Sequence, residues 1–136
     1  MALVMVLVVA GAAGASEMSE DSACAGGENR GELSMQVRYL TSSIGSGKLS
    51  GNELAEDLRK RAETYAKLRE HARAIADYDR VIELMPDRPS VYYHRGLAYE
   101  EMGRHQRAEA DYRKAKALDP ADKRFTKRLR QLEEHQ

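Results

Sequence analysis

Residues 89–122 read PSVYYHRGLAYEEMGRHQRAEADYRKAKALDPAD, and residues 55–88, directly before them, read AEDLRKRAETYAKLREHARAIADYDRVIELMPDR. The two stretches align at a spacing of 34 residues. Identical pairs are Arg61/Arg95, Tyr65/Tyr99, His71/His105, Arg73/Arg107, Ala74/Ala108, Ala76/Ala110, Asp77/Asp111, Tyr78/Tyr112, Leu84/Leu118 and Pro86/Pro120. This period is typical of a helix-turn-helix unit that stacks into a solenoid. Solenoids present surfaces that bind other proteins, so the period favours a binding module over an enzyme.

Residue sizes predict how the two helices of each copy meet. In an antiparallel hairpin, facing positions lie at equal distances from the turn, which we place near Arg69 and Gly103. The predicted facing pairs are Arg61–Asp77, Ala62–Tyr78, Tyr65–Ala74 and Leu58–Val81, then Arg95–Asp111, Gly96–Tyr112, Tyr99–Ala108 and Tyr92–Ala115. Large side chains thus face small ones, which lets helices pack closely. If the turn requires a positive φ, Arg69 is strained by about 1 kcal/mol where Gly103 is not.

The second copy resembles the tetratricopeptide repeat. The residues that match the family pattern are Tyr92, Gly96, Tyr99, Ala108, Tyr112, Ala115 and Pro120. The first copy matches less closely, with Leu58, Ala62, Tyr65, Ala74, Tyr78, Val81 and Pro86. The resemblance implies an all-α, helix-turn-helix solenoid with full repeats at 55–88 and 89–122. It implies little about the ligand, because the family shares a scaffold.

Amphipathic segments flank the two repeats. Apolar residues at spacings of four and three predict a helix over 33–44, which we interpret as the second half of a leading, degenerate repeat. Ser50 and Glu53 predict the start of the next helix. Phe125, Leu129 and Leu132 predict a last helix that caps the array within 123–136. The predicted repeat domain is therefore 33–136.

The first 32 residues have a different character. A short apolar run, followed by Ala13-Gly14-Ala15, predicts a signal peptide over 1–15 with cleavage after Ala15. Residues 16–32 lack periodicity and hold five acidic residues, which predicts a disordered acidic linker. We therefore expect export to the periplasm or beyond, without a stable membrane span. Cys24 is the only cysteine, so no internal disulfide can form.

Catalytic and metal-binding chemistry is not indicated. His71 and His105 occupy one repeat position, which favours packing over coordination, and no ligand cluster accompanies them. Asp77 and Asp111 face arginines, so an ion pair explains them better than acid-base catalysis. The chain carries 22 basic and 22 acidic residues, so its net charge gives no argument for nucleic acid. We predict no enzyme, no metal, no cofactor and no nucleic-acid partner; the basic residues of 123–130 are interpreted as a solvated face.

The resemblance places a concave groove on the first helix of each unit. Its predicted partner-binding residues are Glu56, Arg59, Glu63, Tyr93, Leu97, Glu100 and Lys127. Relatives that clamp a chaperone's C-terminal carboxylate use a Lys and an Asn where Arg59 and Glu63 stand, so that function is not expected. We predict an adaptor that binds a peptide or helix of a partner protein. Two alternatives stay open: a self-assembling structural protein, and a non-catalytic accessory subunit of an envelope enzyme.

Overall fold

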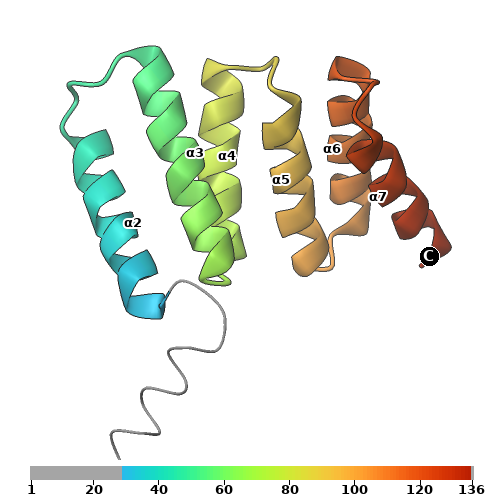
Figure 1. Cartoon of the computed structure of the whole chain (residues 1–136), viewed down its shortest axis with the longest axis horizontal. Coiled ribbons are helices and arrows are strands. Elements are labelled where there is room, and N and C mark those ends of the chain that lie inside the picture. The colour runs from blue at the N-terminus through green and yellow to red at the C-terminus, as the bar shows by residue number, and fades with distance from the viewer. Residues whose placement is uncertain (1–28, 136) are drawn as a thin grey trace, which may run out of the picture. The chain divides into compact units, whose positions relative to one another are not determined.

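The computed structural model describes residues 29–135, which form six helices and no strand. They are α2 (Arg30–Gly45), α3 (Gly51–Lys67), α4 (His71–Leu84), α5 (Pro89–Glu101), α6 (His105–Leu118) and α7 (Lys123–Glu134). The chain divides into two units between Glu32 and Leu33, and, apart from the start of α2, the features described below lie in the second unit. Within that unit, consecutive helices from α3 to α7 pack against each other (Figure 1). The predicted all-α fold is confirmed.

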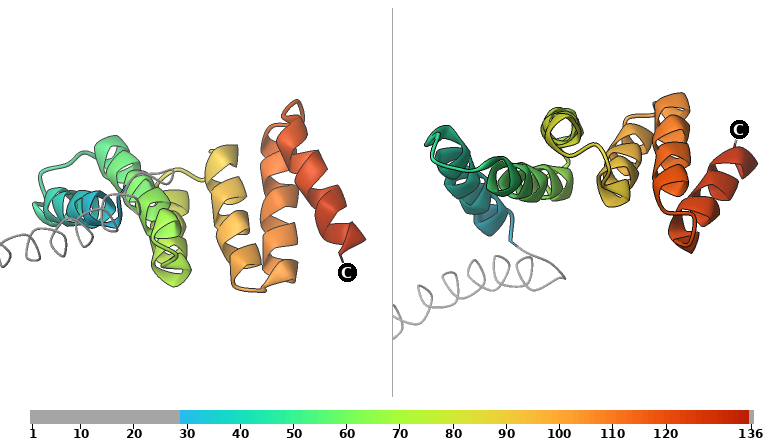
Figure 2. Two further views of the ribbon diagram at one scale, coloured as in Figure 1. Left: turned by 60° about the horizontal axis from the view of Figure 1, so that its bottom comes forward. Right: turned by 90° about the horizontal axis from the view of Figure 1, so that it is seen from above.

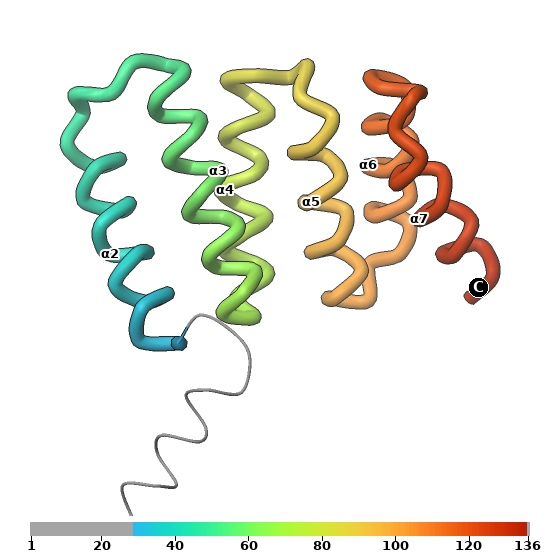
Figure 3. Tube along the Cα trace, viewed as in Figure 1, coloured from blue at the N-terminus to red at the C-terminus, as the bar shows by residue number. Residues whose placement is uncertain are grey.

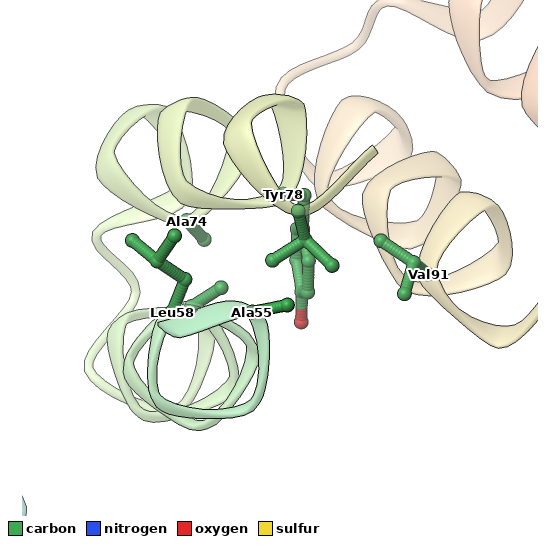
Figure 4. Close-up of a cluster of buried hydrophobic side chains, with 7 residues drawn as sticks. Ala55, Leu58, Ala74, Tyr78 and Val91 are labelled. Atoms are coloured by element: carbon green, nitrogen blue, oxygen red, sulfur yellow. The ribbon is translucent and has the colours of Figure 1, made fainter. Parts of the chain in front are cut away.

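Each repeat is an antiparallel helix pair, α3 with α4 and α5 with α6, as the Cα trace in Figure 3 shows. The predicted pairs Arg61–Asp77, Arg95–Asp111 and Gly96–Tyr112 are confirmed, and the members of each other predicted pair share one core cluster. In the core of the first pair, Tyr78 lies beside Ala55, Leu58 and Ala74, with Val91 of α5 next to it (Figure 4). All five side chains are buried. A single layer of apolar residues therefore joins the first repeat to the next.

An arginine–aspartate ion pair, which we call the hairpin lock, joins the two helices of each repeat. The Arg61 guanidinium donates to both Asp77 carboxylate oxygens at 2.7 Å, and Arg95 donates to Asp111 at 2.9 and 2.7 Å. The hydrogen bonds to these carboxylates raise the pKa of both guanidinium groups, so both stay charged. The predicted ion pairs are thus structural.

The two intra-repeat turns have the same backbone geometry. Glu70 N donates to the Tyr65 carbonyl at 2.9 Å, and Arg104 N donates to the Tyr99 carbonyl at 2.8 Å. This pattern needs a left-handed residue before the donor. Arg69 has φ 65° and Gly103 has φ 70°. The expected strain at Arg69 is therefore present, since a side chain costs about 1–2 kcal/mol in this conformation.

Helix ends follow the predicted local signals. Ser50 and Glu53 form a reciprocal capping box at the start of α3. Met85 and Asp119, which precede Pro86 and Pro120, adopt φ values of −142° and −140° outside the helical region. This agrees with the restriction that proline places on the residue before it. At the last helix, α7 buries Phe125, Leu129 and Leu132, as predicted.

The predicted linker is wrong at its C-terminal end. α2 begins at Arg30, three residues before the predicted start, because Asn29 Oδ1 accepts a hydrogen bond from Gly31 N at 3.0 Å and caps the helix. The rest of the linker, the predicted signal peptide and Cys24 lie outside the described residues. Within 29–135, every helix is too short or too polar to cross a bilayer.

Candidate functional site

A cavity of about 480 Å³ opens between α3, α4 and α5. These helices are the two of the first repeat and the first of the second, and α4 and α5 lie next to each other in the ribbon views of Figure 2. The cavity therefore lies between the two repeats. Its lining residues are Glu63, Ala66, Lys67, Arg69, His71, Tyr78, His94, Leu97, Ala98 and Glu101. We call this cavity the inter-repeat pocket.

The pocket contains an uncharged aromatic pair. The Tyr78 ring stacks on the His94 ring, with 6.4 Å between centroids and 16° between planes. Burial raises the pKa of the Tyr78 hydroxyl and lowers the pKa of the His94 imidazole. Both rings are therefore neutral at pH 7. Leu97, Ala66 and Ala98 add aliphatic surface, so much of the lining is apolar.

Charged residues form the rest of the lining and balance in sign, with Glu63 and Glu101 against Lys67 and Arg69. Arg69 Nη1 lies 3.0 Å from a Glu101 carboxylate oxygen, an ion pair between the α3–α4 turn and the end of α5. Glu63 accepts a hydrogen bond from Arg59. The pocket therefore presents apolar surface flanked by internally paired charges.

Three predicted groove residues belong to one ion-pair chain on α3. Arg59 binds Glu63 and, at 2.9 Å, Glu56, while Glu56 also binds Arg88. The hydrogen bond from Arg59, with a further contribution from Arg88, lowers the pKa of Glu56. The prediction placed these residues on one face. The structure adds that their charges already neutralise one another.

Tyr93 is partly a packing residue. Its ring lies 5.7 Å from the Tyr112 ring and 5.4 Å from the Phe125 ring, and the Arg124 guanidinium lies 5.6 Å from its centroid. Tyr93 therefore helps to hold α7, and replacing it would disturb the fold as well as the groove. Leu97 also packs against the core of the second repeat, and in addition it lines the inter-repeat pocket with Glu63.

The remaining predicted groove residues, Glu100 and Lys127, do not line the pocket. The Glu100 carboxylate accepts hydrogen bonds from the Tyr112 hydroxyl and, at 2.8 Å, from Arg128 Nε. This joins α5 to α6 and α7, so Glu100 stabilises the second repeat. Lys127 is exposed on α7. Whether these predicted residues bind a partner stays a prediction.

A family model described as the tetratricopeptide repeat matches residues 89–122, and a second model, described as a TPR repeat, matches residues 62–103. These ranges contain both intra-repeat turns, the Arg95–Asp111 ion pair and all the residues that line the inter-repeat pocket. The domain has the tetratricopeptide repeat fold. The matches also support assigning its two hairpins to that family.

Solved tetratricopeptide structures agree with this assignment. The TPR domain of Arabidopsis OM64 is similar at TM-score 0.68 and 25% identity, over 77% of this chain and 84% of that chain. MamA from Desulfovibrio magneticus RS-1 gives TM-score 0.67 and 18% identity, over 75% of this chain and 55% of that one. The first TPR of Spaghetti (RPAP3), bound to the HSP90 peptide SRMEEVD, is similar at TM-score 0.56 and 19% identity, over 79% of this chain and 94% of that chain. Domains of this fold generally mediate protein–protein interactions.

Sequence reasoning missed both pocket histidines as site residues. His94 could have been found, because it stands where the first tetratricopeptide repeat has Lys60 and so is not a shared scaffold position. His71 could not, because His105 repeats it. The two differ only in context: both His71 ring nitrogens are buried without a hydrogen-bond partner, whereas His105 is exposed. The interpretation that both pack is therefore wrong for His105.

Within 29–135, no group of three potential metal ligands occurs.

Proposed function

We propose that this chain is a non-catalytic adaptor that holds a segment of a partner protein on the face formed by α3 and α5. An apolar side chain of that segment enters the inter-repeat pocket. The observation that carries this proposal is the pocket itself, with apolar surface from Tyr78, Leu97 and Ala66 between charges that already have partners. Its volume lies within the range of about 300–1,000 Å³ that is common for ligand sites.

Apolar burial would supply most of the binding free energy. Fully burying one large aliphatic or aromatic side chain contributes about 1.5–3 kcal/mol. The paired charges around the pocket would contribute less to affinity, because each must exchange a present partner for a new one. They would favour segments with matching polar groups and thereby set selectivity.

The groove does not favour an acidic C-terminal tail of the kind that RPAP3 binds in the peptide SRMEEVD. A tail carboxylate near the pocket would have to compete with the carboxylates that already bind its cations. Glu56 and Glu63 bind Arg59, and Glu101 binds Arg69. We therefore propose an internal, largely apolar segment as the ligand.

We further propose that the protein acts after export, in the periplasm or outside the cell. The support is the apolar N-terminal run with its small-residue site before Ser16. Sequencing the N-terminus of protein recovered from the producing cell tests this. A mature chain that begins at Ser16 agrees, and an intact Met1 contradicts it.

Selection from a random peptide library tests the pocket. Peptides selected on the wild-type chain are expected to share a large apolar residue and to lose at least about tenfold in affinity on Leu97→Ala, which is about 1.4 kcal/mol. Leu84→Ala is the matched control, since Leu84 is an exposed leucine outside the pocket. Circular dichroism verifies that both variants remain folded. Equal affinity for the two variants would refute the pocket as the binding site.

A further inference from the structure

One side-chain contact between α2 and α3 has a counterpart between α4 and α5, although α2 and α3 pack less closely than α4 and α5 do. Arg95 Nη1 of α5 donates to Asp79 Oδ1 of α4 at 2.7 Å. One repeat earlier, Arg61 Nη1 of α3 donates to Thr41 Oγ1 of α2 at 3.1 Å. Thr41 therefore occupies the place of Asp79, and α2 corresponds to α4 at an offset of 38 residues, the difference between 79 and 41. The interpretation of α2 as a second half-repeat gains a structural basis.

This offset identifies the face of α2 that would contact a first helix of its own. In α4, Asp77 binds Arg61 of α3, and the Arg73 guanidinium lies 5.7 Å from the centre of the Tyr65 ring. The corresponding residues of α2 are Tyr39 and Met35. Their side chains are 73% and 65% exposed. α2 thus presents an exposed apolar pair where α4 has its contacts with α3.

α7 presents the face that the first helix of a repeat turns toward its second helix. It follows α5 by one repeat of 34 residues, so Leu129 occupies the place of Arg95 and Thr126 that of Tyr92. In α5, these positions face α6. In α7, they line a groove of about 570 Å³ beside α6, together with Ala117, Pro120, Arg130 and Glu133. We call it the terminal groove; it lies where the second helix of a third repeat would pack.

We propose that the terminal groove of one copy binds α2 of a second copy. The contact completes an intermolecular repeat, with α7 as its first helix and α2 of the next copy as its second. The residues that replace the Arg–Asp ion pair agree with this proposal. Where each complete repeat has an arginine on its first helix and an aspartate on its second, α7 has Leu129 and α2 has Tyr39. The junction would therefore have an apolar pair in place of the ion pair.

The terminal groove also carries charge, with Arg113, Lys116 and Arg130 against Glu133. α2 itself carries Arg30 and Arg38 against Glu32, so the apolar residues of the junction supply its binding free energy. Because the two contacting surfaces differ, the junction is heterologous and repeats from copy to copy, so assembly forms chains of molecules and does not stop at a dimer.

Sedimentation velocity on the full chain tests the proposal. The wild type is expected to form a concentration-dependent series of oligomers. Tyr39→Asp should weaken association at least tenfold, because it places a carboxylate against Leu129. Ala117→Arg should do the same by filling the groove, since Ala117 is exposed there. Leu84→Asp, the same kind of change at an exposed leucine elsewhere, should associate like the wild type.

Mixing the two defective chains distinguishes a head-to-tail contact from a symmetric one. The Tyr39→Asp copy keeps an intact groove, and the Ala117→Arg copy keeps an intact α2. Their mixture should therefore form a 1:1 heterodimer and nothing larger. A monomeric wild type, wild-type assembly of Tyr39→Asp, or a mixture that stays monomeric would each overturn the proposal. The test is independent of the inter-repeat pocket, because neither Tyr39 nor Ala117 lines that pocket.

Discussion

One guanidinium in this domain binds two carboxylates in different surroundings, and the fold should depend on them unequally. Arg95 donates to Asp111 through Nε and Nη2 at 2.9 and 2.7 Å, and to Asp79 through Nη1 at 2.7 Å. The Asp111 side chain is 7% exposed, whereas the Asp79 side chain is 47% exposed. Asp111→Asn and Asp79→Asn are therefore a matched pair of perturbations on the same arginine.

Burial sets the two magnitudes. Asp111→Asn removes the buried countercharge of Arg95 and one of two parallel hydrogen bonds, and we expect a loss of about 3 kcal/mol in unfolding free energy. Asp79→Asn removes a partner that water can replace, so its loss should not exceed about 1 kcal/mol. With a denaturant slope of about 1–3 kcal/mol per M, the first loss lowers the urea midpoint by about 1–3 M.

Urea unfolding followed by circular dichroism measures both values. Equal losses, or a larger loss for Asp79→Asn, would refute the claim that the hairpin lock lies inside each repeat. A small loss for both would show that Arg95 is held mainly by stacking on Tyr92 and Tyr99, from whose ring centres it lies 5.8 Å.

Three further predictions concern the turn, the pocket and the ligand. Gly103→Ala should destabilise the fold by about 1 kcal/mol, because residue 103 has a positive φ and no atom within 4 Å of the added carbon would clash with it. Arg69→Gly should raise the thermal midpoint, because it removes a side chain from the same conformation. Because burial lowers the folded-state pKa of His94 below its ordinary 6.5, stability is retained above pH 6.5 and falls as the pH drops below it, by at most about 1.4 kcal/mol per pH unit. His94→Phe should flatten this dependence in urea titrations. The peptide SRMEEVD should show no saturable binding by fluorescence anisotropy, and micromolar binding would contradict the proposed apolar ligand.

The repeated residues were predictable because they form contacts inside each hairpin. Exact recurrence of Arg61, Asp77 and Tyr78 at a spacing of 34 fixed the facing partners, and the structure reproduces them. The positive φ at Arg69 followed from its alignment with Gly103. Local geometry of this kind depends on few residues, so a sequence pattern determines it.

The site was less predictable because it depends on contacts between repeats. Glu100 was placed in the groove by its repeat position, yet Arg128 of the last helix holds it. Tyr93 was predicted to bind a partner, yet Phe125 and Tyr112 contact it. These three contacting residues, Arg128, Phe125 and Tyr112, lie in α6 and α7, and the 34-residue period does not predict their contacts with α5. His71 has the same limitation, since its burial comes from stacking.

The proposed function requires the inter-repeat pocket to receive an apolar side chain of a partner. Nuclear magnetic resonance of the ¹⁵N-labelled chain, titrated with a peptide selected on the wild type, tests this requirement. We expect the largest amide shift changes to cluster at Ala66, His71, Leu97 and Ala98, which line the pocket on three helices. Changes confined to α2 or to the terminal groove, with these four amides unmoved, would contradict it.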